Sequence, residues 1–360
     1  MTTGNDPCTT GRTVGDASPA VVDQQESPKA WQEIVAGYQQ PSPRRASWQI
    51  VNTIGSYAAL WFLIYLSLSV SWCLTLPLAV VAGALLVRVF IIFHDCGHGS
   101  FFRSQRANAV WGYITGLLAF TPYRHWRWEH SVHHATAGKL DRRGVGDIWT
   151  LTVQEYLEAS RWKRFSYRLA RNPIVLFVIA PFFLIVVKHR IPSLKAGRRE
   201  RLSVLWMNLA VVSMVSVLCT LYGIGPYLLI QSTVMAVAGA AGVWLFYIQH
   251  QFEDTYWEME NWDYAAAALQ GSSFYKLPRV LQWLSGNIGF HHIHHLNPRI
   301  PNYNLEKCHR SASLFQEVKP LTLFSSLSLV SLSLWDENTK EMVGFRALKQ
   351  RGGKCLQHTA

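Results

Sequence analysis

Residues 74–93 read LTLPLAVVAGALLVRVFIIF and run directly into HDCGH at residues 94–98. Arg88 is the only charged residue in this mostly apolar first stretch, which has about the 20 residues that a helix needs to cross a membrane. In helical geometry, His94 and His98 lie one turn apart on the same face. The segment therefore predicts a membrane-spanning helix followed by a pair of histidine side chains.

Two more histidine clusters follow, HSVHH at residues 130–134 and HHIHH at residues 291–295. Each places histidines at positions i, i+3 and i+4, so a helix can point three imidazoles at one spot. Neutral imidazole is the commonest metal ligand, and one tetrahedral metal needs only four ligands. The pattern therefore predicts two metal ions, held by His94, His98, His130, His133, His134, His291, His294 and His295.

Composition indicates a membrane protein, because 49% of the 360 residues are hydrophobic and only 16% are charged. The 15 tryptophans and 14 tyrosines suit two membrane–water interfaces. The formal net charge of +12 favours contact with anionic headgroups, and no nucleic-acid-binding motif accompanies it. The six cysteines are scattered without a C-x-x-C pair, which argues against disulfides or a thiolate site. We expect the Cys96 side chain to project away from His94 and His98.

Four apolar segments are long enough to span a membrane and pair as two hairpins: residues 50–70 with 74–93, and residues 205–221 with 227–248. The connecting turns contain no Lys or Arg, whereas the N-terminal, middle and C-terminal regions contain many. The positive-inside rule places those three regions in the cytoplasm. The predicted fold is an all-α polytopic membrane protein, with interfacial helices and a cytoplasmic helical cap that carry all three histidine clusters on one side.

Two shorter apolar stretches, residues 107–121 and 174–187, fall short of the hydrocarbon core and are expected to be interfacial or re-entrant. Arg88 lies near the cytoplasmic end of its span and is expected to snorkel to the interface. We expect a disordered cytoplasmic tail over residues 1–43, a membrane domain over 44–335 and a basic tail over 336–360.

The histidine clusters and their flanks resemble those of the membrane fatty acid desaturases, over roughly residues 45–345. The short first cluster and the flanking sequences are most similar to the bacterial acyl-lipid branch, including Δ12 (omega-6) and Δ5 types. The resemblance rests on FHDCGHGSF (93–101), WEHSVHH (128–134), HATAGKLDRRG (134–144), YIQHQFEDTYW (247–257), GFHHIHHL (289–296) and NPRIPNYNL (297–305).

This resemblance implies a centre of two iron ions that uses O2 and two electrons to introduce a cis double bond into a lipid-linked acyl chain. It adds His250 to the eight histidine ligands. An asparagine that contributes through water in animal acyl-CoA relatives is replaced here by Phe246. The chain has no cysteine array for an iron–sulfur cluster and no haem signature, so an external reductant such as ferredoxin is expected. The bacterial inner membrane, with a cytoplasmic active site, is the expected location.

Metal-bound imidazoles usually donate their second N–H to a carboxylate or a carbonyl. The residues that lie near the clusters in sequence and could support a ligand in this way are Asp95, Glu129, Asp147, Glu253, Asp254, Asn287 and His292. His125 suits an aromatic belt with Trp126 and Trp128. The remaining histidines, His189, His309 and His358, are expected at the surface.

Two alternative functions remain at this point. A membrane hydroxylase or related oxygenase would share the first C–H abstraction and differ in its product. A histidine-rich metal transporter or sensor would need polar ligands near the bilayer midplane, and the four predicted spans contain almost none.

Overall fold

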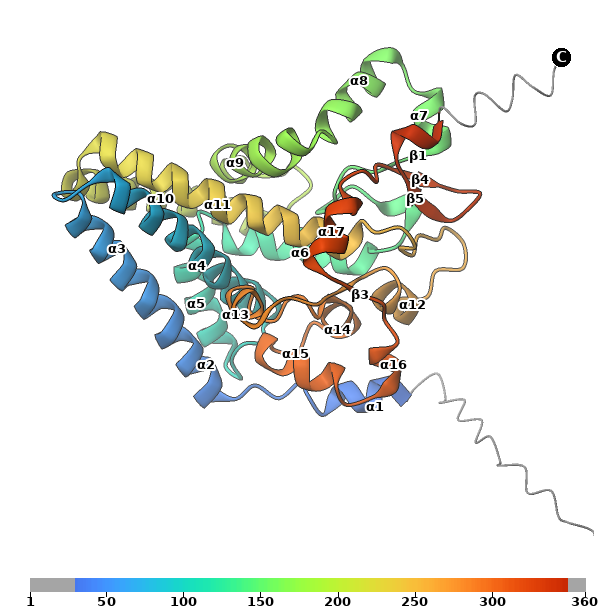
Figure 1. Cartoon of the computed structure of the whole chain (residues 1–360). Coiled ribbons are helices and arrows are strands. Elements are labelled where there is room, and N and C mark those ends of the chain that lie inside the picture. The colour runs from blue at the N-terminus through green and yellow to red at the C-terminus, as the bar shows by residue number, and fades with distance from the viewer. Residues whose placement is uncertain (1–29, 349–360) are drawn as a thin grey trace, which may run out of the picture.

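The computed structural model describes residues 30–348 and is mostly helical (Figure 1). The helical elements of its first half are α1 (Ala30–Ala36), α2 (Pro43–Ile50), the π-helical turn η1 (Val51–Gly55), α3 (Ser56–Ser67), α4 (Trp72–His98), α5 (Gln105–Leu118), α6 (Tyr123–Thr136), the 3-10 turn η2 (Leu140–Arg142), α7 (Val153–Glu158) and α8 (Arg161–Ala170). Those that follow are η3 (Val175–Ile179, π-helical), α9 (Ala180–Val186), η4 (Lys188–Arg190, 3-10), α10 (Arg198–Tyr222), α11 (Ile224–His250), α12 (Tyr264–Leu269), α13 (Arg279–Leu284), α14 (His291–Leu296), α15 (Asn302–His309), α16 (Ser313–Gln316) and α17 (Leu323–Leu329).

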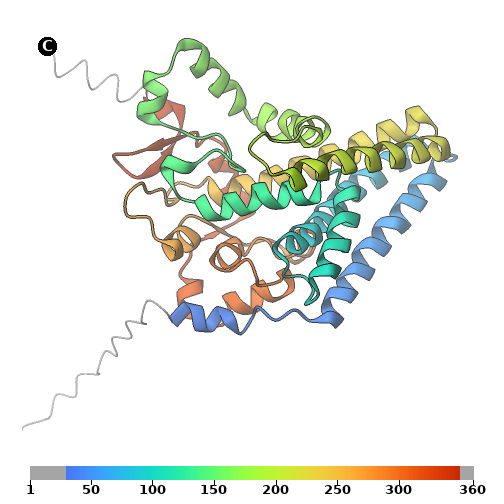
Figure 2. The same ribbon diagram turned by 180° about the vertical axis from the view of Figure 1, so that it is seen from behind.

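Four helices are long and apolar enough to cross a membrane: Pro43–Ser67, Trp72–His98, Arg198–Tyr222 and Ile224–His250. They correspond to the four predicted spans and form the two predicted hairpins. Both α4 and α11 end in a histidine, at the end away from the hairpin turn. The structure therefore brings the two histidine-bearing helix ends to one end of the bundle (Figures 1 and 2).

The helices α4 and α11 pack against each other in the centre of the bundle, and α3 and α5 flank α4. Gly83 permits this close approach, because a Cβ there would lie 2.6 Å from the Val237 side chain and 2.9 Å from the Val234 carbonyl oxygen. Small residues allow helix backbones to approach in membrane proteins, where packing replaces the hydrophobic effect as the force that joins helices. The packed α4–α11 pair carries His94, His98 and His250.

The two shorter apolar stretches do not form straight spans. Helix α5 covers Gln105–Leu118 and is too short to cross alone. The second stretch lies in Val175–Arg190, which is bent by 63° relative to α8 and forms with it either a broken span or a re-entrant loop.

Short strands supplement the predicted helices. The strands are β1 (Leu151–Thr152), β2 (Phe274–Tyr275), β3 (Pro320–Leu321), β4 (Leu334–Asp336) and β5 (Glu341–Val343). β4 pairs in parallel with β1 and antiparallel with β5, and β2 pairs in parallel with β3. The fold therefore continues beyond residue 335, where the sequence predicted the C-terminal tail to begin.

Two sequence expectations need correction. Residues 30–36, expected to belong to a disordered tail, form α1, and Val35 is buried against the third histidine segment. Arg88 does not snorkel, since it is 7% exposed, donates from Nε to Thr53 Oγ1 at 3.0 Å and from Nη1 to the Trp283 carbonyl, and lies over the Trp283 ring. The Thr53 hydroxyl and the Trp283 carbonyl thus accept the hydrogen bonds that water at the interface was expected to accept. The expected tail over residues 1–29 lies outside the described residues.

Candidate metal centre

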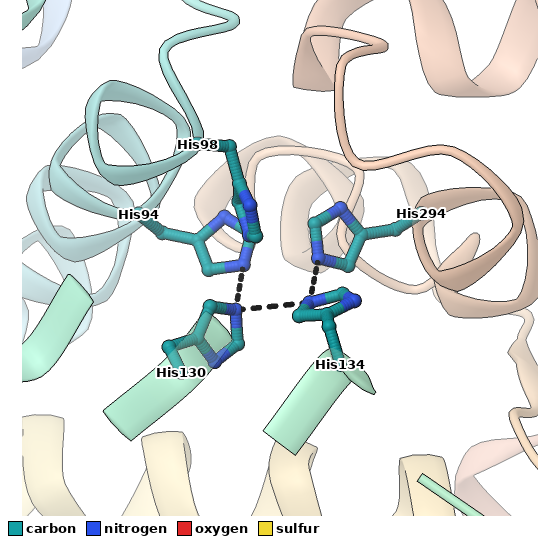
Figure 3. Close-up of side chains that lie close together, drawn as sticks. All are labelled: His94, His98, His130, His134 and His294. Atoms are coloured by element: carbon teal, nitrogen blue, oxygen red, sulfur yellow. Dashed lines mark hydrogen bonds between the residues drawn. The ribbon is translucent and has the colours of Figure 1, made fainter. Parts of the chain in front are cut away.

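Five imidazoles from three helices converge in a first cluster (Figure 3). Helix α4 supplies two rings, α6 supplies two and α14 supplies one, and each offers a nitrogen within 4.8 Å of the others. The Nε2 atoms of His94 and His130 lie 3.0 Å apart, those of His130 and His134 3.1 Å apart, and those of His134 and His294 3.0 Å apart. His98 completes this first cluster.

A second cluster forms beside the first. Nitrogens of His133, His250 and His295 lie within 4.8 Å of one another. His291 joins them, because its Nε2 lies 3.0 Å from His250 Nε2 and its ring centroid 4.5 Å from that of His295. All nine histidines proposed as ligands are thus divided between the five of the first cluster and the four of the second cluster.

Two helices serve both clusters. On α6, His134 joins the first cluster and the preceding His133 joins the second. On α14, His294 and His295 divide in the same way. Adjacent helical positions differ by about 100° in direction, so one residue is enough to aim a ring into the other cluster. The His134 and His295 rings stack with centroids 4.2 Å apart, which makes the two clusters immediate neighbours.

The ring nitrogens fit a metal better than they fit one another. His130 Nε2 and His134 Nε2 each lie about 3 Å from two other Nε2 atoms. A ring nitrogen has one in-plane lone pair or one hydrogen and can serve one partner only. The Nε2 atoms of His98, His133 and His295 are buried without any hydrogen-bond partner. Cations at the two centres would satisfy these converging donors.

Three rings are held from behind by oxygen atoms. His94 Nδ1 lies 3.0 Å from Asp95 Oδ1, and His133 Nδ1 lies 2.6 Å from Asp147 Oδ1. His250 Nδ1 lies 3.2 Å from the Gly271 carbonyl oxygen. An Nδ1–H that donates to such an oxygen leaves the Nε2 lone pair free for a metal. Two of the predicted supporting carboxylates, Asp95 and Asp147, thus lie where that role requires.

Burial favours the neutral, ligating form of the rings. Outside the spanning helices, burial first and neighbouring imidazoles second lower the pKa well below the ordinary histidine value for His130, His134, His291, His294 and His295. Burial alone would raise the pKa of Asp147, but the hydrogen bond to His133 and that from the Gly144 amide lower it overall. A neutral ring beside an ionised carboxylate is the arrangement that metal binding requires.

Other residues expected to support the ligands lie elsewhere. Glu129 Oε2 lies 3.6 Å from His125 Nδ1, and its other oxygen lies 3.5 Å from Lys188 Nζ. Glu253 and Asp254 are exposed on the loop after α11. Asn287 has a φ of 61° and donates to the Asn302 carbonyl at 3.2 Å, so it shapes the turn before α14. Residues 285–289 form a turn, so the chain is not a continuous helix through Asn287 into α14.

The other histidines of the described residues are buried and belong to neither cluster, although His189 and His309 were expected at the surface. His125 accepts a hydrogen bond from the Ser193 amide at 3.0 Å, and its ring centroid lies 5.8 Å from that of Trp128, one of its two expected aromatic neighbours. His292 Nε2 lies 3.0 Å from His309 Nδ1, behind α14 and apart from both clusters. His189 is also buried. His358 lies outside the described residues.

Sequence reasoning missed two supporting groups. The Asn302 amide and side chain both donate to Asp95 Oδ2, at 2.6 and 2.9 Å, so Asn302 holds the carboxylate that holds His94. The second is the Gly271 carbonyl, a backbone group that no side chain in the sequence indicates. Asn302 belongs to the NPRIPNYNL segment that resembles the desaturases, but its separation of 207 residues from Asp95 conceals the contact.

Phe246 occupies the position of the asparagine noted above. Its ring centroid lies 5.2 Å from that of His133 and 5.2 Å from that of His250. The second cluster therefore has an apolar wall at this point, where a water-mediated ligand would require a polar group.

Comparison with known proteins agrees with these motifs. A family model described as "Fatty acid desaturase" matches residues 71–322. A Bacillus subtilis protein named "Fatty acid desaturase" is 48% identical over 88% of this chain and 90% of its own length. A Picosynechococcus "sn-1 oleoyl-lipid 12-desaturase" is 24% identical over 83% of this chain and 81% of its own. A Synechocystis "sn-1 acyl-lipid omega-3 desaturase (ferredoxin)" is 28% identical over 63% of this chain and 64% of its own.

Proposed function

The chain belongs to the fatty acid desaturase family, whose members are oxidoreductases that introduce double bonds into acyl chains, and we propose that it desaturates a lipid-linked acyl chain at a di-iron centre. The observation that carries the proposal is the convergence of nine imidazoles into two adjacent clusters at one end of four apolar helices. An all-nitrogen ligand set suits iron, and the apolar helices bring membrane lipid close to it.

The protein's own part in this reaction is to orient the histidine rings, to keep them uncharged and to exclude water from them. Asp95, Asp147 and the Gly271 carbonyl orient three rings, and burial keeps the others uncharged. Two iron ions bound by these rings would supply O2 activation and the oxidation of two adjacent methylene groups. Six of the nine rings are buried, so most of the site where the two iron ions would be held is shielded from bulk water.

The double-bond position that we propose is Δ12, and the electron donor is a ferredoxin. The first rests on the relatives named as oleoyl-lipid 12-desaturases, at 24% and 25% identity, and the second on the ferredoxin-dependent relative. The positive-inside argument supports a cytoplasmic active site in a bacterial inner membrane. This proposal puts the histidines and the Lys- and Arg-rich segments on the same side of the membrane.

A hydroxylase built on the same fold is the second candidate. Hydroxylation and desaturation begin with the same C–H abstraction, and the sets of histidine ligands do not distinguish them. The name of the 48% identical relative favours desaturation.

The deciding experiment is the fatty-acid profile of a host that expresses this chain together with a ferredoxin and its reductase. Double bonds are located by mass spectrometry of derivatised esters. We expect a new unsaturated acyl chain, with the double bond at Δ12, in the wild type. The matched control is His134→Ala, which removes one ring from the first cluster outside the spanning helices.

Each product has its own meaning. A double bond at another position would correct Δ12 and leave desaturation intact. A hydroxylated chain would move the protein to the oxygenase branch. Equal product from His134→Ala and wild type would refute the metal assignment.

A further inference from the structure

A basic pocket of about 540 Å³ opens beside the first cluster. It lies between residues 39–41 ahead of α2, the end of α4 and the start of α5. His98 lines it, together with the exposed side chains of Arg103, Arg127 and Arg299. One imidazole of the candidate metal centre thus also forms part of a surface pocket.

The three arginines carry uncompensated charge. No carboxylate lines the pocket, and within residues 30–348 none of the three guanidinium groups takes part in an ion pair. Three like charges around one concave site raise the local concentration of an anionic partner and speed its association. The pocket is therefore suited to carboxylate or phosphate groups.

His98 connects this pocket with the first cluster. Its Nε2 is buried among the cluster nitrogens, while the ring is only partly buried and lines the pocket. The helix end that carries it is firmly held: the Gln105 side chain donates to the Gly99 carbonyl at 3.1 Å, and the Ser100 amide donates to the Asp95 carbonyl at 3.0 Å. A partner seated in the pocket would touch a candidate ligand directly.

This closeness excludes the headgroup of the lipid being oxidised. The hydrocarbon core is about 30 Å thick, so a mid-chain carbon lies roughly 7 Å or more below its own headgroup. The carbon has to reach the metal centre, so the phosphate must stay well away from the cluster. A phosphate bound in this pocket would contact His98 and would therefore lie too close to the metal centre to belong to that lipid. An electron donor, in contrast, is favoured by the shortest distance to the metal centre.

We infer that the pocket formed around His98 by Arg103, Arg127 and Arg299 is the docking site of an acidic one-electron carrier of the ferredoxin type, an inference that rests on the proposed function. Two reduced carriers dock in turn, and each is oxidised by one electron. These two electrons, with two protons from water and the two hydrogens removed from the acyl chain, reduce O2 to two water molecules. The chain loses two hydrogens and gains one double bond.

The test measures binding and turnover separately. The enzyme is held in nanodiscs of zwitterionic lipid at low salt, and the probe is a plant-type [2Fe–2S] ferredoxin. Arg299→Glu and Arg103→Glu are each expected to raise the Kd for oxidised ferredoxin roughly tenfold. Each should also make this Kd less dependent on salt than it is in the wild type. The matched control is Arg346→Glu, an exposed arginine near β5, whose Kd should change less than about twofold. Arg299→Lys keeps the charge and should keep most of the affinity.

Turnover with dithionite and methyl viologen should be equal in all variants, because a small reductant needs no docking site. Equal Kd values for the pocket variants and Arg346→Glu would overturn the inference. So would a raised KM for lipid with unchanged ferredoxin binding, which would assign the pocket to a headgroup. A ferredoxin whose acidic patch is replaced by lysines should bind the Arg299→Glu enzyme more tightly than it binds the wild-type enzyme. If it does not, the inference is also overturned. Absence of product with every reductant, while ferredoxin still binds, would instead refute the proposed function.

Discussion

The two histidine clusters are built from the same side chain and differ in their access to solvent. In the first cluster, His98, His130 and His134 are partly exposed, and a pocket reaches the first of them. In the second cluster all four rings are buried, and Phe246 covers two of them. The donor atoms are alike, so the surrounding side chains, rather than the ligands, give the two sites different roles. We expect electrons to enter at the first.

Removing one ring from either cluster tests whether both are needed. His94→Ala and His250→Ala should each lower product formation by at least about 100-fold, since loss of a group that merely supports a ligand already costs 10- to 100-fold. Each variant should keep close to one iron per chain when metal is measured beside product. Normal activity in His250→Ala would reduce the centre to the first cluster alone.

The supporting carboxylates allow a finer comparison. Asp95→Asn acts on the first cluster and Asp147→Asn on the second, and each should weaken iron binding roughly 10- to 100-fold. Asp95→Asn should have the larger effect, because it also sets an amide against the two N–H groups of Asn302. The change in iron affinity is measured as the release of iron when the protein is diluted.

Asp141→Asn is the matched control for this pair, since Asp141 is exposed and lies near Arg142 at the surface. It should leave iron affinity unchanged. If it weakened binding as much as Asp147→Asn, general loss of negative charge would explain both results.

Metal removal should separate the two clusters in time. A chromophoric iron chelator is expected to take one iron roughly tenfold faster than the other, because access to the second cluster requires local opening of buried structure. The fast phase should belong to the first cluster and should disappear in His94→Ala. A single phase for both ions would contradict the difference in access.

The smallest effect is expected at Phe246. Phe246→Asn places a polar group beside His133 and His250 and should admit water to the second cluster. Activity should change only a few fold, while Mössbauer spectra should change for one iron and not for the other. Phe246→Leu keeps the wall apolar and should leave both spectra as in the wild type.

Much of the site was predictable because it is local. The spacing in HSVHH and HHIHH indicates the histidines that converge, but it predicted that each triplet would point at one spot, whereas the structure divides each triplet between the two clusters. The supporting contacts were less predictable. Asp95 and Asp147 could be proposed from proximity in sequence, but the same reasoning proposed Glu129, which lies against Lys188. Burial of Arg88, His189 and His309 depends on helices that approach from elsewhere in the chain.

The sequence by itself determined the helical class, the four apolar spans, the eight histidines of the three motifs and the family resemblance that adds His250, because these follow from composition, periodicity and short motifs. Only the tertiary structure decided that His133 and His134 serve different clusters, that Asn302 holds Asp95, and that three arginines surround His98. The physical reason is the range of the interactions. Helical spacing decides which way a side chain points relative to its neighbours, whereas helix packing decides what lies there to meet it.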